Sequence, residues 1–332
     1  MKIGKHEVGK GKPVFIVAEA GINHNGDFQI AKKMIKAATN FGADAIKFQT
    51  IFPDELYSSK DNNQLYNLIN KWSFNKKQHK ELKKYAEKNK IEFFSTPVGN
   101  RSANLLFEIG CKCFKIASGE LTNLELIKNI AKMKRPMIVS TGLSTPQEIT
   151  SAVKIIRKQK CPFVLLHCNA SYPSPLNDVN LRNIEYLNEV YGVPIGFSDH
   201  TMGNEACLAA VSLGACIIEK HFTLDKKMKG PDQKLSADVS DFKELVTKIR
   251  IVEKTFGTLR KGPTPSEKKF VTLLRKSLVA NKDITKNTKI KKSMLTSLRP
   301  GIGISLAKID KLVGMRIKKN IKKGTILKWK MF

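Results

Sequence analysis

Short apolar runs that end abruptly in polar residues recur eight times along the first part of the chain. The polar ends are Glu19, Lys47 to Gln49, Ser95-Thr96, Lys115 to Glu120, Ser140-Thr141, His167-Cys168, Ser198 to His200 and Glu219 to His221. A barrel of eight parallel strands needs apolar strands and collects its chemistry where those strands end. The pattern therefore predicts an α/β fold of the (β/α)8, or TIM-barrel, type and indicates which end of the barrel carries the site.

Segments with helical periodicity separate these runs, as alternating strands and helices require. Asp27 precedes a segment whose apolar residues share one face. Thr145 to Glu148 form a capping box with proline at the first helical position, a strong start signal. Further helices are expected at residues 75–89, 124–133, 204–213 and 241–256. Together these elements account for one barrel domain over residues 1–256, close to the roughly 250 residues typical of that fold.

The sequence changes character after residue 256. Residues 257–276 contain Gly262-Pro263-Thr264-Pro265-Ser266 and many charges, a composition that interrupts helices and predicts a linker. A second, small domain is expected over residues 277–332. Its two ends resemble each other at an offset of 37 residues, with Asp283 to Ile290 aligning on Asn320 to Leu327. Two copies are too few for a solenoid and predict a small module with internal pseudo-symmetry.

The chain is strongly basic, with 59 Lys and Arg against 29 Asp and Glu and a formal net charge of +30. Most of the excess is lysine scattered along the predicted helices. No basic block is interleaved with aromatic residues and no known nucleic-acid reader motif appears, so no nucleic-acid partner is expected. The lysines instead cover solvated faces, and their field would help to attract an anionic substrate.

The six cysteines form no Cys-x-x-Cys pair, and several fall inside predicted strands or helices. They are interpreted as small buried hydrophobic side chains in a reducing compartment. Cys168 ends a strand and could be a nucleophile, but no activating base lies near it in sequence, so packing is the better interpretation. No signal segment opens the chain and no apolar run approaches the roughly eighteen residues of a membrane span, which predicts a cytoplasmic protein without membrane contact.

Two histidines carry the most specific chemistry. His200 and His221 follow neighbouring strands, so their imidazoles can converge and share a divalent metal ion. Two protein nitrogens leave coordination positions for water and substrate oxygens, as Lewis-acid activation of a carbonyl requires. A lone histidine at a strand end is more often a hydrogen-bonding residue, but two on neighbouring strands favour the metal. Imidazole suits several first-row metals, so the ligands do not select one.

The other side of the barrel mouth carries groups suited to a phosphorylated acid. Lys47 and Lys115 supply fixed positive charge. Neutral donors accompany them at Gln49, Thr96, Ser118, Ser140 and Ser198. Such a set can hold a carboxylate and a phosphate. Lysines that merely cap strand ends and hydroxyls that serve turns are the alternative, but coincidence at five strands explains the pattern poorly.

Carboxylates complete the group of candidates. Glu19, Glu120 and Glu219 end strands, and Asp232 follows in a loop. A carboxylate near a bound sugar can hold hydroxyls or move a proton. Each could instead be a structural partner for the nearby lysines, and for Glu219 the two interpretations are equally supported.

Six motifs then stand out in order along the chain. They are Ala-Glu-Ala-Gly-Ile-Asn-His-Asn-Gly at 18–26, Lys-Phe-Gln-Thr at 47–50, Lys-Ile-Ala-Ser-Gly-Glu at 115–120, Ser-Thr-Gly at 140–142, Ser-Asp-His-Thr at 198–201 and Glu-Lys-His-Phe-Thr at 219–223. In order and spacing they resemble the sialic acid synthase family. The C-terminal part, with Arg299-Pro300-Gly301 between its repeats, resembles the antifreeze-like (SAF, β-clip-like) module that these synthases carry.

The resemblance implies a transferase that condenses phosphoenolpyruvate with an N-acylated mannosamine-type sugar to form a nine-carbon 2-keto acid. Carbon 3 of phosphoenolpyruvate attacks the open-chain aldehyde, water adds at carbon 2, and carbon–oxygen cleavage expels phosphate. It further implies that His200 and His221 bind a divalent metal, Mn²⁺ or Mg²⁺, which polarises the aldehyde.

The same resemblance distributes further residues between the two substrates. The positions around phosphoenolpyruvate are Lys47, Gln49, Thr96, Lys115, Ser118, Ser140 and Ser198. The positions near the sugar or the reacting centre are Glu19, Glu120, Tyr172 and Asp232. Arg299 is implied to reach the sugar's acyl group from the C-terminal module of a second protomer, so a homodimer with exchanged C-terminal domains is expected.

One position departs from the family. Where some members have an asparagine two residues before the tyrosine of the sixth strand loop, this chain has Ala170, with Asn169 one place earlier. Asn169 could substitute, but its side chain would leave the opposite side of an extended strand.

The acceptor sugar stays open. N-acetylmannosamine, the first expectation, would give N-acetylneuraminic acid, whereas 2,4-diacetamido-2,4,6-trideoxymannose would give legionaminic acid, and a few pocket residues can set this difference. The pseudaminic branch is disfavoured because its first strand motif differs. A phosphoenolpyruvate-dependent synthase acting on a sugar phosphate would want additional basic residues, and a non-catalytic polyanion-binding protein is the remaining alternative.

Overall fold

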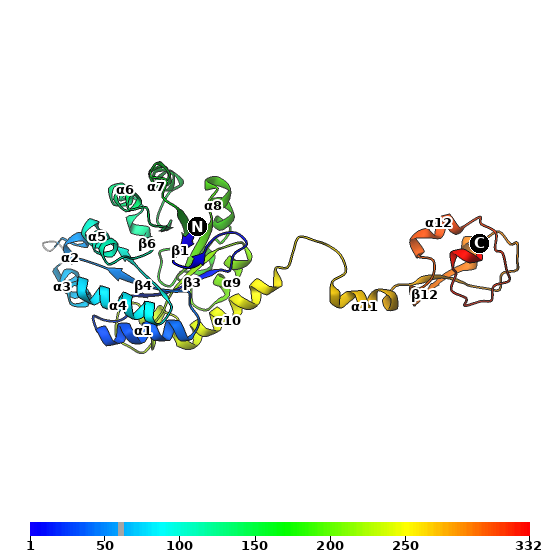
Figure 1. Cartoon of the computed structure of the whole chain (residues 1–332), viewed down its shortest axis with the longest axis horizontal. Helices are drawn as coiled ribbons and strands as arrows, with labels where there is room; N and C mark the ends of the chain where they lie inside the picture. The colour runs from blue at the N-terminus through cyan, green and yellow to red at the C-terminus, as the bar shows by residue number, and fades with distance from the viewer. Residues whose placement is uncertain (59–62) are drawn as a thin grey trace. The chain divides into compact units, whose positions relative to one another are not determined.

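The computed structural model describes residues 1–58 and 63–332 and forms two compact units, Met1–Gly257 and Thr258–Phe332. In the first unit, eight parallel strands close into a barrel in the order β10-β3-β4-β5-β6-β7-β8-β9. Helices of this unit lie around its strands (Figure 1). The TIM-barrel prediction is therefore confirmed. The strands are β3 (Phe15–Gly21), β4 (Ala45–Thr50), β5 (Glu92–Pro97), β6 (Phe114–Ile116), β7 (Met137–Ser140), β8 (Phe163–Cys168), β9 (Ile195–Asp199) and β10 (Ile217–His221).

Eight helices of this unit follow the strands in turn. They are α1 (Phe28–Asn40), α4 (Lys76–Lys88), α5 (Asn100–Glu108), α6 (Leu124–Lys132), α7 (Pro146–Lys158), α8 (Asn183–Tyr191), α9 (Glu205–Ser212) and α10 (Val239–Thr255). Asp27 caps α1 by accepting from the N–H groups of Gln29 and Ile30. The expected capping box opens α7 at Thr145. Because side chains satisfy the free N–H groups at these ends, both helix starts could be predicted from sequence.

Several helices and strands differ from those that the sequence pattern predicted. The sequence pattern predicted no element for α5 and α8, nor for α2 (Pro53–Leu56) and α3 (Asn63–Trp72). Helix α10 begins two residues early because Asp238 accepts from the N–H groups of Ser240 and Asp241. A short N-terminal hairpin, β1 (Lys2–Ile3) and β2 (His6–Glu7), precedes the barrel.

The interior of the barrel is apolar at one end and polar at the other. The inner cluster contains Ile3 and Val8 of the N-terminal segment, residues from six strands, and two cysteines that stand just before β6 and β10. The strand residues are Phe15, Val17, Ala45, Phe94, Ile138, Val164, Leu166 and Ile217, and the cysteines are Cys113 and Cys216. Residues two apart on a strand share a face. Each charged residue of the site stands two positions after an apolar residue of this cluster and therefore faces the same interior. The pairs are Val17 and Glu19, Ala45 and Lys47, Cys113 and Lys115, and Ile217 and Glu219. A packed apolar floor thus supports a layer of charges.

The six cysteines are buried as free thiols. Their interpretation as small hydrophobic side chains is therefore confirmed. Among the residues that the structure describes, no helix is long and apolar enough to cross a bilayer.

The second unit begins with a helix where the sequence suggested a linker. Helix α11 (Pro265–Leu274) starts at a capping box formed by Thr264 and Glu267. The predicted linker over residues 257–276 therefore contains a helix that its composition did not indicate, because Pro265 stands at the first helical position, where proline is tolerated. The rest of the unit comprises β11 (Ser277–Ala280), β12 (Leu295–Leu298), α12 (Ile309–Leu312) and irregular chain around a small apolar cluster.

The internal repeat of this unit is real and pseudo-symmetric. Ile284 and Ile321, which occupy equivalent positions, exchange both of their backbone hydrogen bonds at 2.8 Å. The Asp283 carboxylate accepts from the N–H of Lys323, and the equivalent Asn320 side chain accepts from the N–H of Lys286, again at 2.8 Å. The two halves therefore brace each other through matching contacts.

Gly196 gives a direct test of the packed floor. An added Cβ would lie 2.5 Å from Leu166 Cδ2 and 2.7 Å from Ile217 Cβ, both in the inner cluster. We expect Gly196→Ala to lower the free energy of unfolding by about 1–3 kcal/mol, because close-packed interiors do not admit extra atoms without strain. Gly262→Ala, which meets no atom within 4 Å, is the control. Equal unfolding curves in urea for the two variants would contradict this picture of the interior.

Candidate active site

A cavity of about 320 Å³ lies at the carboxyl ends of the barrel strands. It brings together all the predicted site residues except Asp232 and Arg299. Those that line it are Glu19, Lys47, Gln49, Thr96, Lys115, Ser118, Glu120, Ser140, Tyr172, Ser198, His200 and His221. The convergence arises because these residues lie at or just beyond the carboxyl ends of neighbouring strands of one closed sheet.

Two lysines and two glutamates form an ion network inside this cavity. Lys47 Nζ lies 2.8 Å from Glu19 Oε2 and 3.6 Å from Glu219 Oε1. Lys115 Nζ donates to Glu219 Oε1 at 3.0 Å, and the Ser198 hydroxyl donates to the same oxygen at 3.0 Å. All four charged side chains are almost fully buried. Glu219 therefore joins both lysines, which bears out its interpretation as their structural partner.

The two glutamates respond to burial in opposite ways. Burial raises the pKa of Glu19 to about 7, although the Lys47 charge opposes this shift. Burial would also raise the pKa of Glu219, but Lys115 and Lys47 outweigh it and hold that pKa at about 2. Glu219 is thus ionised at neutral pH, whereas Glu19 has an affinity for protons suited to acid–base chemistry.

The two histidines converge as the sequence predicted. The Tyr172 hydroxyl lies 2.6 Å from Nε2 of His200 and 3.2 Å from Nε2 of His221. Nδ1 of His200 faces the carbonyl oxygen of Asn169 at 2.5 Å. Because a carbonyl only accepts, Nδ1 carries the proton and Nε2 presents its lone pair to the cavity.

This donor pair fits a divalent metal ion. Burial lowers the pKa of His200 to about 4 and also holds that of His221 well below its usual range, so both imidazoles are neutral at physiological pH. Both Nε2 atoms point to one oxygen, which is the arrangement that a shared ion would need. The described residues contain no group of three or more His, Cys, Asp or Glu side chains able to hold a metal. The remaining ligands would therefore come from water or substrate.

The other predicted site residues have different surroundings, inside the cavity or outside it. Asp232 lies beside the cavity, with Oδ2 3.8 Å from Nδ1 of His221. Glu120 is at the mouth and accepts from the Asn123 side chain. Arg299 belongs to the second unit, where its guanidinium donates to the carbonyl of Leu274 at 2.9 Å. The Ser140 hydroxyl is buried with no hydrogen-bond partner in the described part of the chain, so it is free to donate to a ligand.

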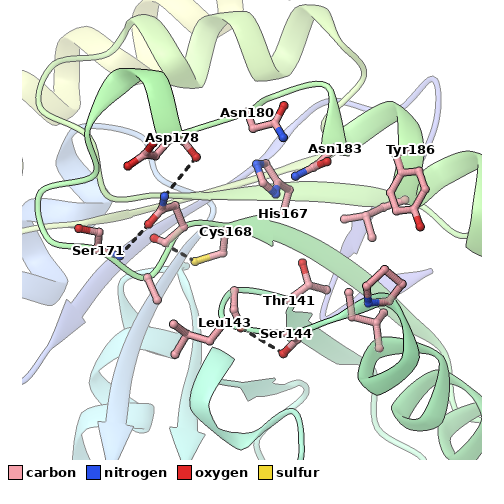
Figure 2. A pocket seen from close by; sticks show the side chains of 16 residues that line it. Thr141, Leu143, Ser144, His167, Cys168, Ser171, Asp178, Asn180, Asn183 and Tyr186 are labelled. Carbon is pink, nitrogen blue, oxygen red and sulfur yellow. Dashed lines mark hydrogen bonds between the residues drawn. The ribbon is translucent and has the colours of Figure 1, made fainter.

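Asn169 does not replace the missing asparagine in this cavity. Ala170 lines both this cavity and a second one of about 630 Å³ between the segments that follow β7 and β8, whereas Asn169 lines the second cavity but not the first. Figure 2 shows this second cavity. There its side chain donates to the carbonyl of Asp178 at 3.1 Å and accepts from the N–H of Ser171 at 2.8 Å. Asn169 itself lies just beyond the end of β8, so the side of the strand from which its side chain leaves stays a prediction.

Cys168 lines both cavities, but it is not an activated nucleophile. Burial raises the pKa of its thiol, and its sulfur lies 3.8 Å from Nδ1 of His200, the nitrogen already committed to a backbone carbonyl. The packing interpretation is therefore supported.

The sequence did not reveal the apolar wall of the cavity. Ile51, Leu56 and Val98 line it beside the polar groups and pack together with Ile69 and Trp72. These residues lie after β4 and β5 and in α2 and α3. Because the helices in this loop were not recognised, no periodicity pointed to a shared apolar face.

Comparisons with known proteins agree with this site. A model described as the NeuB family matches residues 34–261, and an SAF domain model matches residues 275–332. The N,N'-diacetyllegionaminic acid synthase of Campylobacter jejuni is 42% identical over 332 residues, which cover 96% of this chain and 99% of that protein. The human N-acetylneuraminate-9-phosphate synthase is 35% identical over 301 residues, covering 87% of this chain and 84% of that protein.

A solved structure supports the same assignment. The N-acetylneuraminic acid synthetase of Leptospira borgpetersenii, crystallised with citrate, is similar with a TM-score of 0.78 and 40% identity, covering 81% of this chain and 94% of that one. The chain therefore belongs to the NeuB family of sialic acid-type synthases and carries a C-terminal SAF domain. The resemblance seen in its motifs is confirmed.

One motif histidine supports the fold rather than the cavity, and its titration can be tested. His24 is 1% exposed, stacks on Phe74 at 4.2 Å between ring centroids and accepts from the N–H of Gly26. Burial lowers its pKa from 6.5 to about 3. Between these values only the unfolded chain takes up the proton, so stability is lost as pH falls below about 6.5.

We expect His24→Gln to reduce the slope of the free energy of unfolding against pH by about 1.4 kcal/mol per pH unit between pH 4.5 and 5.5. Urea unfolding at both pH values, for the parent and the variant, measures this difference. Parallel slopes would show that His24 is protonated in the folded protein.

Proposed function

We propose that this chain condenses phosphoenolpyruvate with an N-acylated mannosamine-type aldose to give a nine-carbon 2-keto acid and inorganic phosphate. One observation carries the proposal: a single cavity holds two buried lysines and, beside them, two neutral imidazoles aimed at one point. The lysines suit the anionic substrate, and the imidazoles suit a metal ion that activates the aldehyde. Family membership supports the same reaction class.

The bond changes balance without an oxidant or reductant. Carbon 3 of phosphoenolpyruvate bonds to the aldehyde carbon, whose oxygen takes up a proton. Water adds at carbon 2 and loses a proton. The carbon 2–oxygen bond to phosphate then breaks and the remaining hydroxyl proton passes to the departing phosphate, which leaves the keto group and releases inorganic phosphate. We assign proton exchange with the reacting oxygens to Glu19, because its pKa of about 7 allows it to give and to accept protons.

The anion would enter a network in which both lysines already have carboxylate partners. Lys47 pairs with Glu19, and Lys115 pairs with Glu219. A bound phosphate or carboxylate would compete with these glutamates and would also receive hydrogen bonds from hydroxyl groups. Gln49, Thr96, Ser118, Ser140 and Ser198 are the neutral donors proposed for this role. Charge-assisted hydrogen bonds of this kind are about twice as strong as neutral ones.

His200 and His221 would hold the divalent ion, Mn²⁺ or Mg²⁺, through their Nε2 atoms. When bound, the ion supplies Lewis-acid polarisation of the aldehyde carbonyl. The Tyr172 hydroxyl contacts Nε2 of both histidines in this structure, so it would have to move away when a metal ion binds there. It could then contact the sugar. Glu120 and Asp232, at the edge of the cavity, are the carboxylates proposed to hold sugar hydroxyls.

An enzyme with these substrates would work in the cytoplasm.

Two acceptors remain under this proposal. N-acetylmannosamine would make the protein an N-acetylneuraminate synthase. The second candidate, 2,4-diacetamido-2,4,6-trideoxymannose, would make it a legionaminic acid synthase. The Campylobacter jejuni relative named for diacetyllegionaminic acid, 42% identical, supports the second candidate, and the Leptospira borgpetersenii synthetase named for N-acetylneuraminic acid, 40% identical, supports the first equally.

Phosphate release from phosphoenolpyruvate tests the reaction and the acceptor together. We expect phosphate release to require Mn²⁺ and one of the two sugars. The rate should fall at least about 100-fold in His200→Ala and in His221→Ala, because a metal ion supplies several kcal/mol of charge stabilisation. His6→Ala, in the N-terminal hairpin, should keep the parental rate. The proposal would be refuted if no phosphate were released with either sugar, or if both cavity variants kept full activity.

We also propose a homodimer in which the SAF domain of one protomer completes the sugar site of the other through Arg299. Arg299→Ala should raise the KM for the sugar about tenfold or more while leaving the KM for phosphoenolpyruvate unchanged, because a charged hydrogen bond is lost at one substrate only. Lys323→Ala, an exposed cation in the same domain, is the control. An unchanged sugar KM in Arg299→Ala would remove Arg299 from the site.

A further inference from the structure

We propose that Lys220 and Asp199 form a positioning pair that fixes His200 relative to His221 and thereby sets the affinity for the divalent ion. The inference rests on the proposed metal site. Neither residue of the pair lines the catalytic cavity. They act, on this view, by holding the backbone on which the two imidazoles are carried.

The pair stands where the sheet ends. Parallel pairing of β9 with β10 stops at the rung that joins Asp199 to Lys220. His200 follows Asp199 and lies just beyond β9, while His221 follows Lys220 and is paired only with β3, opposite Glu19. The distance between the two imidazoles is therefore not fixed by hydrogen bonds of the β9–β10 ladder.

Side-chain contacts take over where the ladder stops. Lys220 Nζ donates to Asp199 Oδ2 at 2.6 Å and to the carbonyl oxygen of Thr201 at 2.8 Å. Asp199 Oδ1 accepts from the N–H of Thr201 at 2.9 Å. The residues on both sides of His200 are thus tied to one ammonium group, and that group belongs to the residue immediately before His221.

The outer face of the barrel holds this pair rigidly. Asp199 and Lys220 alternate with the inward-facing histidines, so their side chains lie on the opposite face of the sheet. There the Cys207 thiol of α9 donates to Asp199 Oδ2 at 3.0 Å. The side chains of Lys220 and Asp199 are 5% and 0% exposed. A buried ammonium with a carboxylate and a carbonyl as partners has little freedom to move.

Elsewhere His200 is attached mainly to a loop. Its Nδ1 donates to the carbonyl of Asn169, and its own carbonyl accepts from the N–H of Ser174 at 2.9 Å. Both partners belong to the segment between β8 and α8. The Lys220–Asp199 pair is what connects His200 to the strand that carries the second histidine. Outer contacts that orient metal-binding imidazoles typically change metal affinity 10- to 100-fold when removed.

A purely structural ion pair is the competing explanation, and a double variant separates the two. Lys220→Met leaves Asp199 buried without its cation, which is strongly destabilising. Lys220→Met combined with Asp199→Asn removes both charges. We expect this neutral pair to recover much of the lost melting temperature, while it still lacks the bond from Nζ to the Thr201 carbonyl.

The experiment measures Mn²⁺ affinity of the full-length protein by the electron paramagnetic resonance signal of free Mn²⁺. Phosphoenolpyruvate affinity without metal is measured by calorimetry, and the melting temperature is recorded for each variant. Arg250→Met is the matched control, because Arg250 also bonds a carboxylate, Asp44, and a carbonyl, Val14, at the amino end of the barrel. It should lower the melting temperature and leave Mn²⁺ affinity unchanged.

We expect the double variant to raise the Mn²⁺ dissociation constant 10- to 100-fold, with phosphoenolpyruvate affinity within about twofold of the parent. Turnover should return when Mn²⁺ is raised to saturation. If Lys220→Met does not fold, the double variant still decides the question. Parental Mn²⁺ affinity in a folded double variant would overturn this inference and leave the proposed function standing. A parent protein that binds no Mn²⁺ would overturn the metal site as well.

Discussion

The structure depends above all on burying four charges at one level of a closed barrel. Lys47, Lys115, Glu19 and Glu219 each stand two residues beyond an apolar side chain of the inner cluster, so the same strands that pack the floor carry the charges into the mouth. Burying any one of these groups alone would be prohibitive, whereas mutual pairing makes the set tolerable. The apolar floor keeps water out below, and the network holds the side chains in place above.

That balance has a consequence for binding. A cavity whose lysines already have carboxylate partners can accept an anion only by redistributing those ion pairs, and Glu19 is the group best able to adjust because its pKa is about 7. The histidine side of the cavity is different in kind. Its imidazoles are neutral, and Asn169 fixes the tautomer of His200, so this side offers lone pairs rather than charge. Placing fixed charge beside uncharged donors suits a reaction between an anion and a polarised aldehyde.

Much of this arrangement could be predicted from the sequence, because barrel topology turns a one-dimensional pattern into a shared location. Polar residues at the ends of eight apolar runs must meet, which is why residues as distant as Glu19 and His221 could be placed in one site. Helix starts at Asp27 and Thr145 were also readable, since capping is local chemistry. The same local signal was overlooked at Thr264 and Glu267, where a high density of charges and prolines obscured α11.

The remaining features depend on three-dimensional contacts that no spacing encodes. The role of Glu219 as common partner of both lysines, the Tyr172 hydroxyl between the histidines and the apolar wall from Ile51, Leu56 and Val98 follow from how side chains meet across strands and loops. Asn169 belongs with these features, because its bonds to Asp178 and Ser171 hold its side chain in the second cavity.

The most direct test is a crystal structure of the protein with Mn²⁺ and phosphoenolpyruvate, in which anomalous scattering locates the metal. We predict one metal ion bonded to Nε2 of both His200 and His221, the Tyr172 hydroxyl displaced from between them, and the phosphoenolpyruvate anion in contact with Lys47 and Lys115. A metal bound elsewhere, or an anion outside the cavity while the tyrosine still bridges the histidines, would contradict the account.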